Sequence, residues 1–168
     1  MAKDSSFDIV SEADMQEIDN AFQQTAKEIL SRFDLKESGA RITFSKEKGK
    51  ENITIKAPTE FVLKQVQDIL KTKFAKRNLD FRFVRFGNIE TAAGGTVRVL
   101  GEILAGIEED LIKKLNKDIK NQKFNKVKTQ ITGDKIRVSS PSKNELQKVI
   151  SFVEGKEYIV PLQFVNYR

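Results

Sequence analysis

A pattern of strand, proline and helix occurs twice in this chain, at a constant offset of 83 positions. Residues 53–66 read ITIKAPTEFVLKQV, and residues 136–149 read IRVSSPSKNELQKV. In both copies the alternating apolar residues predict a strand, and the proline that follows cannot continue a strand interior. Leucine and valine then recur three positions apart, as on one face of a helix, and Thr59 and Ser142 are placed to cap that helix. The chain is therefore expected to fold as two copies of one small unit.

The repeat extends beyond these two segments. Residues 83–86 correspond to residues 164–167, and residues 7–12 correspond to residues 97–102. Each half then has the order strand, helix, strand, strand, helix, strand. In the first half we expect strands at 6–11, 40–45, 52–57 and 80–86, with helices at 13–33 and 59–76. In the second half we expect strands at 96–103, 125–132, 135–140 and 161–167, with helices at 105–122 and 142–154.

This order of elements predicts an α+β fold made of two ferredoxin-like (βαββαβ) domains. A chain of 168 residues is long enough for two domains of roughly 80 residues each. We expect the first domain at residues 1–88 and the second at residues 89–168. The glycine-containing segment 87–95 is the expected linker between them.

The chain contains no cysteine and no histidine. Without cysteine, disulfides, thiolate metal sites and cysteine nucleophiles are excluded. Without histidine, the Ser-His-Asp triad and almost every catalytic zinc or non-haem iron site are excluded as well. Neither a P-loop nor the glycine motif of dinucleotide-binding folds occurs. We therefore expect a binding protein that is not an enzyme and that needs no metal and no cofactor.

Lysine and arginine number 30 and aspartate and glutamate 24, which leaves a formal net charge of +6. Such an excess suits a polyanionic partner such as a nucleic acid or a nucleotide, although it also suits a small protein that only has to stay in solution. No stretch reaches the ~18 apolar residues that a membrane span needs, and the N-terminus lacks the apolar segment of a secretion signal. A cytoplasmic protein without a membrane partner is the expectation.

Strand alternation predicts which side chains lie on the open face of each sheet, away from the helices. Ile53, Ile55, Ile136 and Val138 are expected to face the helices. The basic residues expected on the open faces are Lys126, Lys128, Lys135 and Arg137 on one sheet, and Lys56, Arg41, Arg82 and Arg98 on the other. Of these, Lys126, Lys128, Lys135, Arg137, Arg98 and Lys56 are the candidates for binding nucleotide or RNA phosphates.

A cationic, hydrogen-bonding sheet face can capture phosphate and sugar groups. Its central positions here carry no aromatic residue, so stacking of bases would need Phe86 or Tyr167 at the strand ends. The alternative is a solvated face that carries lysine for solubility and for protection of the sheet edge.

Acidic residues are expected near the starts of helices. The run EED at residues 108–110 complements the positive end of the helix at 105–122. Glu12 and Glu102 hold matching positions at strand-to-helix junctions, which favours helix capping. A paired acidic contact at the domain junction is the alternative.

Several segments resemble the YajQ family of small bacterial proteins. Residues 6–12 (SFDIVSE) and 163–168 (QFVNYR) are similar to the two ends of that family. Residues 131–138 (ITGDKIRV), with the leucine and valine positions of residues 146–150, resemble its second hairpin and last helix. The resemblance covers nearly the whole chain.

This resemblance implies two ferredoxin-like domains, similar to RNA-recognition modules, that exchange their first strands. Residues 6–11 would then join the sheet of the second half, and residues 96–103 the sheet of the first. It also implies a cytosolic nucleotide-binding protein without established enzymatic activity. The ligands implied are nucleoside triphosphates (GTP or ATP), tRNA and, for some members, the cyclic dinucleotide cyclic di-GMP.

The chain departs from the family pattern at two helix starts. Leu104-Ala105-Gly106 stands where many members have Lys-Gln-Gly, and residues 139–143 read SSPSK where many have a run like Gly-Lys-Ser-Arg. Both differences remove basic groups from helix N-termini, where a phosphate would be held. A cyclic dinucleotide site copied from other members is not expected here.

The resulting hypothesis is a nucleotide-binding protein that holds nucleotide or RNA phosphates on basic sheet faces or in a cleft between its domains. The alternative is a protein–protein adaptor in transcription or stress response, controlled in some cases by a cyclic dinucleotide. Such an adaptor would bind a protein partner with little dependence on salt, whereas phosphate capture depends strongly on it.

Overall fold

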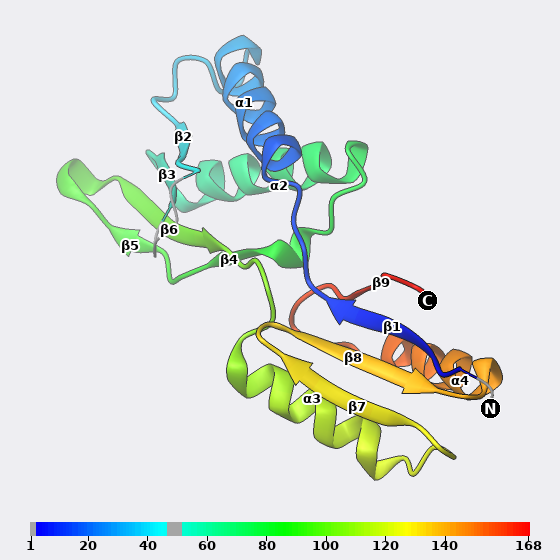
Figure 1. Cartoon of the computed structure of the whole chain (residues 1–168). Helices are drawn as coiled ribbons and strands as arrows, with labels where there is room; N and C mark the ends of the chain where they lie inside the picture. The colour runs from blue at the N-terminus through cyan, green and yellow to red at the C-terminus, as the bar shows by residue number, and fades with distance from the viewer. Residues whose placement is uncertain (1–2, 47–51) are drawn as a thin grey trace. The chain divides into compact units, whose positions relative to one another are not determined.

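The computed structural model describes residues 3–46 and 52–168, and these residues form four α-helices and two antiparallel sheets (Figure 1). The predicted α+β class is confirmed. The chain divides into two compact units. Unit 1 consists of the residues up to Glu12 together with Ala105–Arg168, and unit 2 consists of Ala13–Leu104. The boundary at residue 88 describes the repeat in the sequence and stays a prediction.

Unit 2 contains a sheet whose main strands follow the order β2-β3-β6-β4. These strands are β2 (Arg41–Phe44), β3 (Ile53–Ala57), β6 (Val97–Ile103) and β4 (Val84–Phe86). The short β5 (Glu90–Thr91) pairs with β6 beyond the end of β4. Helices α1 (Met15–Ser31) and α2 (Glu60–Lys76) belong to the same unit.

Unit 1 contains a sheet of four strands in the order β7-β8-β1-β9. The strands are β7 (Lys128–Thr132), β8 (Lys135–Ser140), β1 (Ser5–Val10) and β9 (Gln163–Val165). The helices of this unit are α3 (Glu109–Asn121) and α4 (Lys143–Gly155). In each sheet all neighbours are antiparallel, an arrangement compatible with a ferredoxin-like domain.

Side-chain caps define the starts of three helices. Asp14 accepts hydrogen bonds from the backbone N–H groups of Gln16 and Glu17 at the start of α1. Thr59 and Ser142 cap α2 and α4 in the same way, as their positions after a proline predicted. Glu12 and Glu102 cap no helix, because Glu102 lies within β6 and the cap of α1 is Asp14. The predicted capping role for these two residues is therefore wrong.

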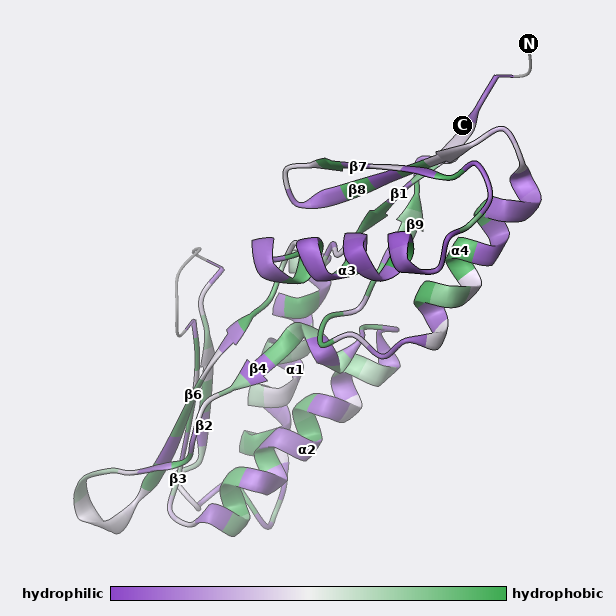
Figure 2. Ribbon diagram, turned by 90° about the horizontal axis from the view of Figure 1, so that it is seen from below, coloured by the Kyte–Doolittle hydropathy of each residue, from purple (hydrophilic) through white to green (hydrophobic). Residues whose placement is uncertain are grey.

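Each unit has its own hydrophobic core. In unit 2, Ile53, Ile55 and Val99 of the sheet are fully buried against α1 and α2, and in unit 1 Ile136 and Val138 are buried in the same way against α3 and α4. The predicted inward positions are thus confirmed. The turns of α3 that face the viewer in Figure 2 are hydrophilic, in agreement with the exposed lysines along this helix.

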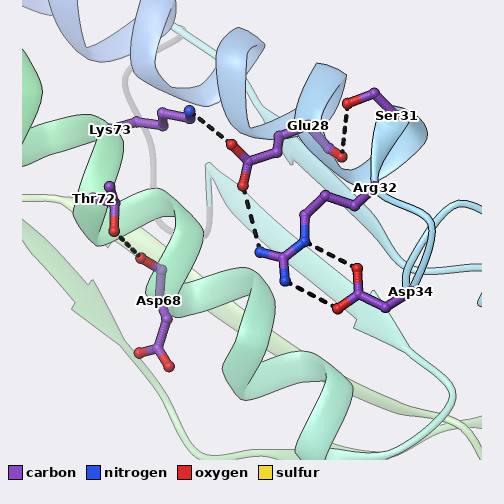
Figure 3. Close-up of polar contacts among 7 residues, drawn as sticks. All are labelled: Glu28, Ser31, Arg32, Asp34, Asp68, Thr72 and Lys73. Atoms are coloured by element: carbon purple, nitrogen blue, oxygen red, sulfur yellow. Dashed lines mark hydrogen bonds and ion pairs between the residues drawn. The ribbon is translucent and has the colours of Figure 1, made fainter.

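Polar contacts join α1 and α2 on the outside of unit 2 (Figure 3). The Lys73 ammonium lies 2.8 Å from a carboxylate oxygen of Glu28, whose other oxygen lies 3.6 Å from the Arg32 guanidinium. Arg32 in turn pairs with Asp34 at 2.9 Å. The hydrogen bond from Lys73 is the main reason why the pKa of Glu28 lies below its ordinary value. The Lys73–Glu28 pair joins α2 to α1, while the apolar core holds both helices against the sheet.

Several predicted elements are shorter in the structure. The segment 80–86 is a strand only from Val84, because Asp80 caps a short 3₁₀ helix at Phe81–Phe83. The segment 125–132 becomes a strand at Lys128, since Lys126 has a left-handed φ of 55°. The helix expected from residue 105 begins only at Glu109, after Gly106 with a φ of 82°. Local backbone geometry and side-chain hydrogen bonds therefore override the apolar pattern at these ends.

The segment 87–95 lies within unit 2 and does not connect the two compact units. Glu90 and Thr91 pair with Arg98 and Val97, so this segment extends the β4–β6 hairpin within unit 2. Gly94 and Gly95 have φ values of 73° and 77°, which only glycine adopts without strain, and they make the turn at the tip. The glycines that suggested flexibility serve a tight turn instead.

Candidate functional site

Three basic side chains stand in one row across the open face of the unit 2 sheet. Arg41 of β2 lies directly opposite Lys56 of β3, and Lys56 lies directly opposite Arg98 of β6. We call these three residues the cation row. Because neighbouring strands are about 4.8 Å apart, the row covers about 10 Å across the strands. The helices pack on the other face of the sheet, so the row remains accessible.

The members of the cation row are poorly neutralised. The Arg98 Nε donates to a carboxylate oxygen of Glu90 at 3.0 Å. Within the described residues, Arg41 and Lys56 make no ion pair and no side-chain hydrogen bond, and both are exposed. Like charges directly opposite each other destabilise a sheet. A polyanion bound along the row would remove this repulsion, which makes the row a candidate phosphate-binding surface.

On the open face of the unit 1 sheet, the basic side chains do not form a row of directly opposed cations. Lys128 lies opposite Ser139, Lys135 opposite Thr132, and Arg137 opposite both Gln130 and Asp8. No two of these cations face each other across strands. Lys126 lies before the start of β7 and therefore has no position on the sheet, in contrast to the prediction.

Asp8 neutralises the centre of the unit 1 face. Arg137 Nε donates to one Asp8 carboxylate oxygen at 3.1 Å, and Asn166 Nδ2 donates to the other at 2.8 Å. Burial opposes ionisation and is the largest single influence on the pKa of Asp8. The hydrogen bonds from Asn166 and Arg137 together outweigh it and hold that pKa below its ordinary value. The predicted binding residue Arg137 is thus engaged within its own sheet.

Arg82, which was also expected on an open face, lies in the 3₁₀ helix before β4. Its guanidinium forms hydrogen bonds to both carboxylate oxygens of Asp80, at 2.8 and 3.1 Å. These bonds are the main cause of the lowered pKa of Asp80. Arg82 therefore stabilises a local turn and is not part of the cation row.

A cavity of about 330 Å³ lies next to the cation row, where β4 gives way to β5. Phe86 pairs with Gly101 and Glu90 with Arg98, so three residues on one strand oppose two on β6. This extra residue makes a β-bulge, a feature that often lies beside binding sites. We call this hollow the bulge cavity. Its lining residues are Arg85, Phe86, Gly87, Asn88, Glu90, Leu100, Gly101 and Glu102.

Gly101 is required for the shape of this region. A Cβ at this position would lie 2.9 Å from the carbonyl oxygen of Arg85 and 2.9 Å from the Phe86 ring. Phe86, one of the two aromatic residues considered for base stacking, lines the cavity, but its ring faces the helices and packs against the core of unit 2. The cavity has no signal in the sequence, because a bulge arises from strand register and no residue motif marks it.

A second cavity, of about 300 Å³, lies in unit 1 between the start of β1, helix α4 and the C-terminal residues. Tyr167, the other aromatic residue considered for stacking, lines this cavity and is 63% exposed. Lys143 and Arg168 are its basic lining residues, and Leu146 and Ile150 are apolar. Each of these two cavities is lined by one of the two aromatic residues that were considered for stacking.

Among residues 3–46 and 52–168, no cluster of three or more acidic side chains is arranged to hold a metal ion. The helices of the same residues include none that is long and apolar enough to cross a membrane.

Comparison with known proteins shows the family to which this sequence is similar. The model of a family described as "Nucleotide-binding protein YajQ-like" matches residues 5–168. A protein of Desulforamulus reducens named "Nucleotide-binding protein" is 44% identical over 168 residues, which cover 100% of this chain and 99% of that protein. Proteins of the same description from Trichodesmium erythraeum and Bacillus cereus (strain AH187) are 45% and 42% identical, with full coverage of both chains.

Proposed function

Because the chain belongs to the YajQ-like family of nucleotide-binding proteins, we propose that it binds the phosphates of a nucleotide or RNA on the open face of the unit 2 sheet. The observation that carries this proposal is the cation row. Three cations in cross-strand register cost the free protein stability, and a bound polyanion compensates for that cost. Arginine and lysine bind phosphate through strong, charge-assisted hydrogen bonds.

Within this proposal the basic residues have different roles. Arg41, Lys56 and Arg98 contact phosphates directly. Lys126, Lys128 and Lys135 belong to unit 1 and contact phosphates of a nucleotide, or of an RNA such as tRNA, on that unit. Arg137 contributes least, because Asp8 already occupies its guanidinium.

The proposed activity is binding without a chemical step. The relatives are named for binding and not for a reaction, and the chain has no histidine or cysteine to act as general base or nucleophile. The cytoplasmic location implied by the family resemblance is part of the same proposal.

The proposed architecture is a duplicated ferredoxin-like domain whose two copies, residues 1–88 and 89–168, exchange their first strands. The strand orders support it. β1 pairs with β8 and β9, which follow it in the chain by more than 100 residues, while β6 pairs with β3 and β4, which precede it. Each copy then contributes the first strand of the other copy's sheet.

Charge reversal in the cation row tests the function. The variant Arg41→Glu/Lys56→Glu and the wild type would be titrated with GTP, with ATP and with a labelled single-stranded RNA at two salt concentrations. We expect the affinity for each bound ligand to fall by at least about tenfold, which is the effect of 1.4 kcal/mol. For RNA, the dependence of log K on log salt should weaken by about 1.4, since each lost phosphate contact removes about 0.7.

The matched control is Lys27→Glu/Lys71→Glu. Both lysines are exposed on the helices of the same unit, and the net charge changes by the same amount. Equal losses in the two variants would show that only the overall charge matters, and the cation row would then not be the site. Absence of binding by the wild type to all three ligands would contradict the proposed function and favour the protein–protein adaptor.

A further inference from the structure

The bulge cavity carries polar side chains that have no partner in the protein. Arg85 and Glu102 lie directly opposite each other on β4 and β6, yet they form no ion pair. Asn88, in the bulge itself, is exposed and makes no side-chain hydrogen bond. Within the described part of the chain, these three residues are therefore free to bind a ligand. Glu90 differs, because it holds Arg98 of the cation row.

The rest of the lining is apolar or backbone. Leu100 is the apolar side chain on the open face of β6, between Arg98 and Glu102. The Phe86 ring lies opposite Gly101 on the helix-facing side, where it packs against the core of unit 2, so Phe86 and Gly101 contribute the edge of the cavity. A cavity of about 330 Å³ with an apolar floor and a few convergent polar groups is typical of a small-molecule site. Its volume is at the lower end of the range for such sites, so it suits a flat base better than a whole nucleotide.

The cavity and the cation row are arranged as parts of one site. Leu100 and Arg98 are two residues apart on the same face of β6, which places their Cα atoms about 7 Å apart. Glu90 lines the cavity and also touches Arg98. A nucleotide whose base occupies the cavity can therefore lay its phosphates along the row.

We propose that the bulge cavity binds the base of a guanine nucleotide and that Glu102 selects guanine over adenine; this inference rests on the proposed function. Guanine presents its N1–H beside the N2 amino group, so one carboxylate can accept two parallel hydrogen bonds from it. Adenine presents an unprotonated N1 at that edge, which a carboxylate repels. Arg85 and Asn88 supply the donors that O6 and N7 of guanine accept.

Base analogues and the variant Glu102→Gln test this selection. Wild-type protein would be titrated with GTP, ATP and ITP, the last of which lacks the N2 amino group. We expect GTP to bind at least about tenfold more tightly than ATP, with ITP between them, since a polar site rejects a base that leaves its groups unpaired. In Glu102→Gln, the GTP affinity should fall at least about tenfold, and XTP should gain relative to GTP, because the amide can donate to its 2-oxo group.

Two further variants serve as controls. Glu37→Gln removes an exposed carboxylate elsewhere in unit 2 and should leave every affinity unchanged. Asn88→Ala, at an exposed position, should weaken GTP binding without loss of the folded state, as checked by circular dichroism. Equal affinities for GTP and ATP, unaffected by Glu102→Gln, would overturn the selection by Glu102 and leave the proposed function standing. Failure of the wild type to bind any nucleotide or RNA would contradict the proposed function itself.

Discussion

At the scale of single residues, Asp8 is the charged side chain that is most fully withdrawn from solvent in the described residues, with 1% exposure. It lies on the sheet face opposite the helices, where its carboxylate accepts from Arg137 and Asn166. A buried carboxylate is costly unless it is hydrogen-bonded, so these two donors are needed for the native state. Asp8 therefore links β1 to both of its neighbouring strands.

Substitution Asp8→Asn should destabilise unit 1 in a pH-dependent way. At pH 7 we expect a loss of about 1.5–3 kcal/mol, the usual worth of hydrogen bonds to a charged group. The lowered pKa means that this stabilisation is present above the unfolded-state value of about 3.9 and is lost as the pH falls through the lower folded-state value. Urea denaturation at pH 7 and pH 3 measures the difference, which should shrink at pH 3.

The exposed Asp4 provides the control for this experiment. Asp4→Asn removes a carboxylate from the same end of the chain and should change stability little at either pH. An Asp8→Asn effect of the same size at pH 3 and pH 7 would mean that the ionised carboxylate is not what stabilises the native state.

For the basic residues that lie on strands, the sequence predicted the face of the sheet but not the partner of the side chain; Lys126 and Arg82 lie outside the strands. Alternation correctly placed Lys56, Arg98 and Arg137 on open faces, because side-chain direction follows from a period of two. Arg137 lies opposite the acidic Asp8 on the neighbouring strand, whereas Arg98 lies opposite the basic Lys56. This difference depends on which strands are neighbours and on their register. Register across strands that are distant in sequence is not encoded in local pattern, so the cation row could not be recognised as one feature.

At the scale of elements, α3 is the one α-helix in the described part of the chain whose start has no side-chain cap. Glu108 has the extended backbone of an N-cap residue, but its side chain makes no capping hydrogen bond. Glu109 and Asp110 in the first turn provide favourable charge, as expected from the sequence. The backbone N–H groups at this end nevertheless lack the partner that Ser142 gives to α4.

Glu108→Asp should therefore stabilise the protein, because the shorter carboxylate can reach the free N–H groups of the first turn. We expect a gain of about 0.5–1 kcal/mol in the free energy of unfolding. Ser142→Ala, which removes an existing cap, should cost about 1 kcal/mol in the same urea titration. Destabilisation by Glu108→Asp would show that the start of α3 is satisfied in another way.

Element types were predictable along most of the chain, and element ends were less so. Apolar residues that recur every second position identify the central strands, and apolar residues that recur every three to four positions identify all four helices of the described residues. The bulge between β4 and β5 has no such signal, since residues 87–89 read as a loop and become part of a hairpin only through pairing with β6. The bulge cavity could not be predicted for the same reason.

At the scale of the whole molecule, the chain forms two units with separate cores, and the first strand belongs to the unit made mainly of the C-terminal residues. Phe7 of β1 is 1% exposed and packs against Phe164 and Tyr167, with ring centroids 5.8 and 6.0 Å apart. The repeat in the sequence predicted two similar units. It could not show which half supplies each first strand, because an arrangement without exchange has the same pattern.

Truncation of Phe7 tests where the first strand belongs. Phe7→Ala should cost about 3–5 kcal/mol, the usual effect of a large core truncation, and should raise amide hydrogen exchange in residues 105–168. Residues 13–104 should keep their protection. The matched variant Phe22→Ala, in the core of unit 2, should show the reverse pattern. Faster exchange in β2 and β3 after Phe7→Ala would contradict the strand pairing described above.

In the proposed function, nucleotide phosphates bind on the open face of the unit 2 sheet. Chemical-shift mapping of the isotope-labelled full chain during titration with GTP tests it most directly, because it locates the ligand without any substitution. We expect the shifted amides to cluster around Arg41, Lys56 and Arg98 and to extend into the bulge cavity. Shifts confined to β7 and β8, or absent from both sheets at saturating GTP, would contradict it.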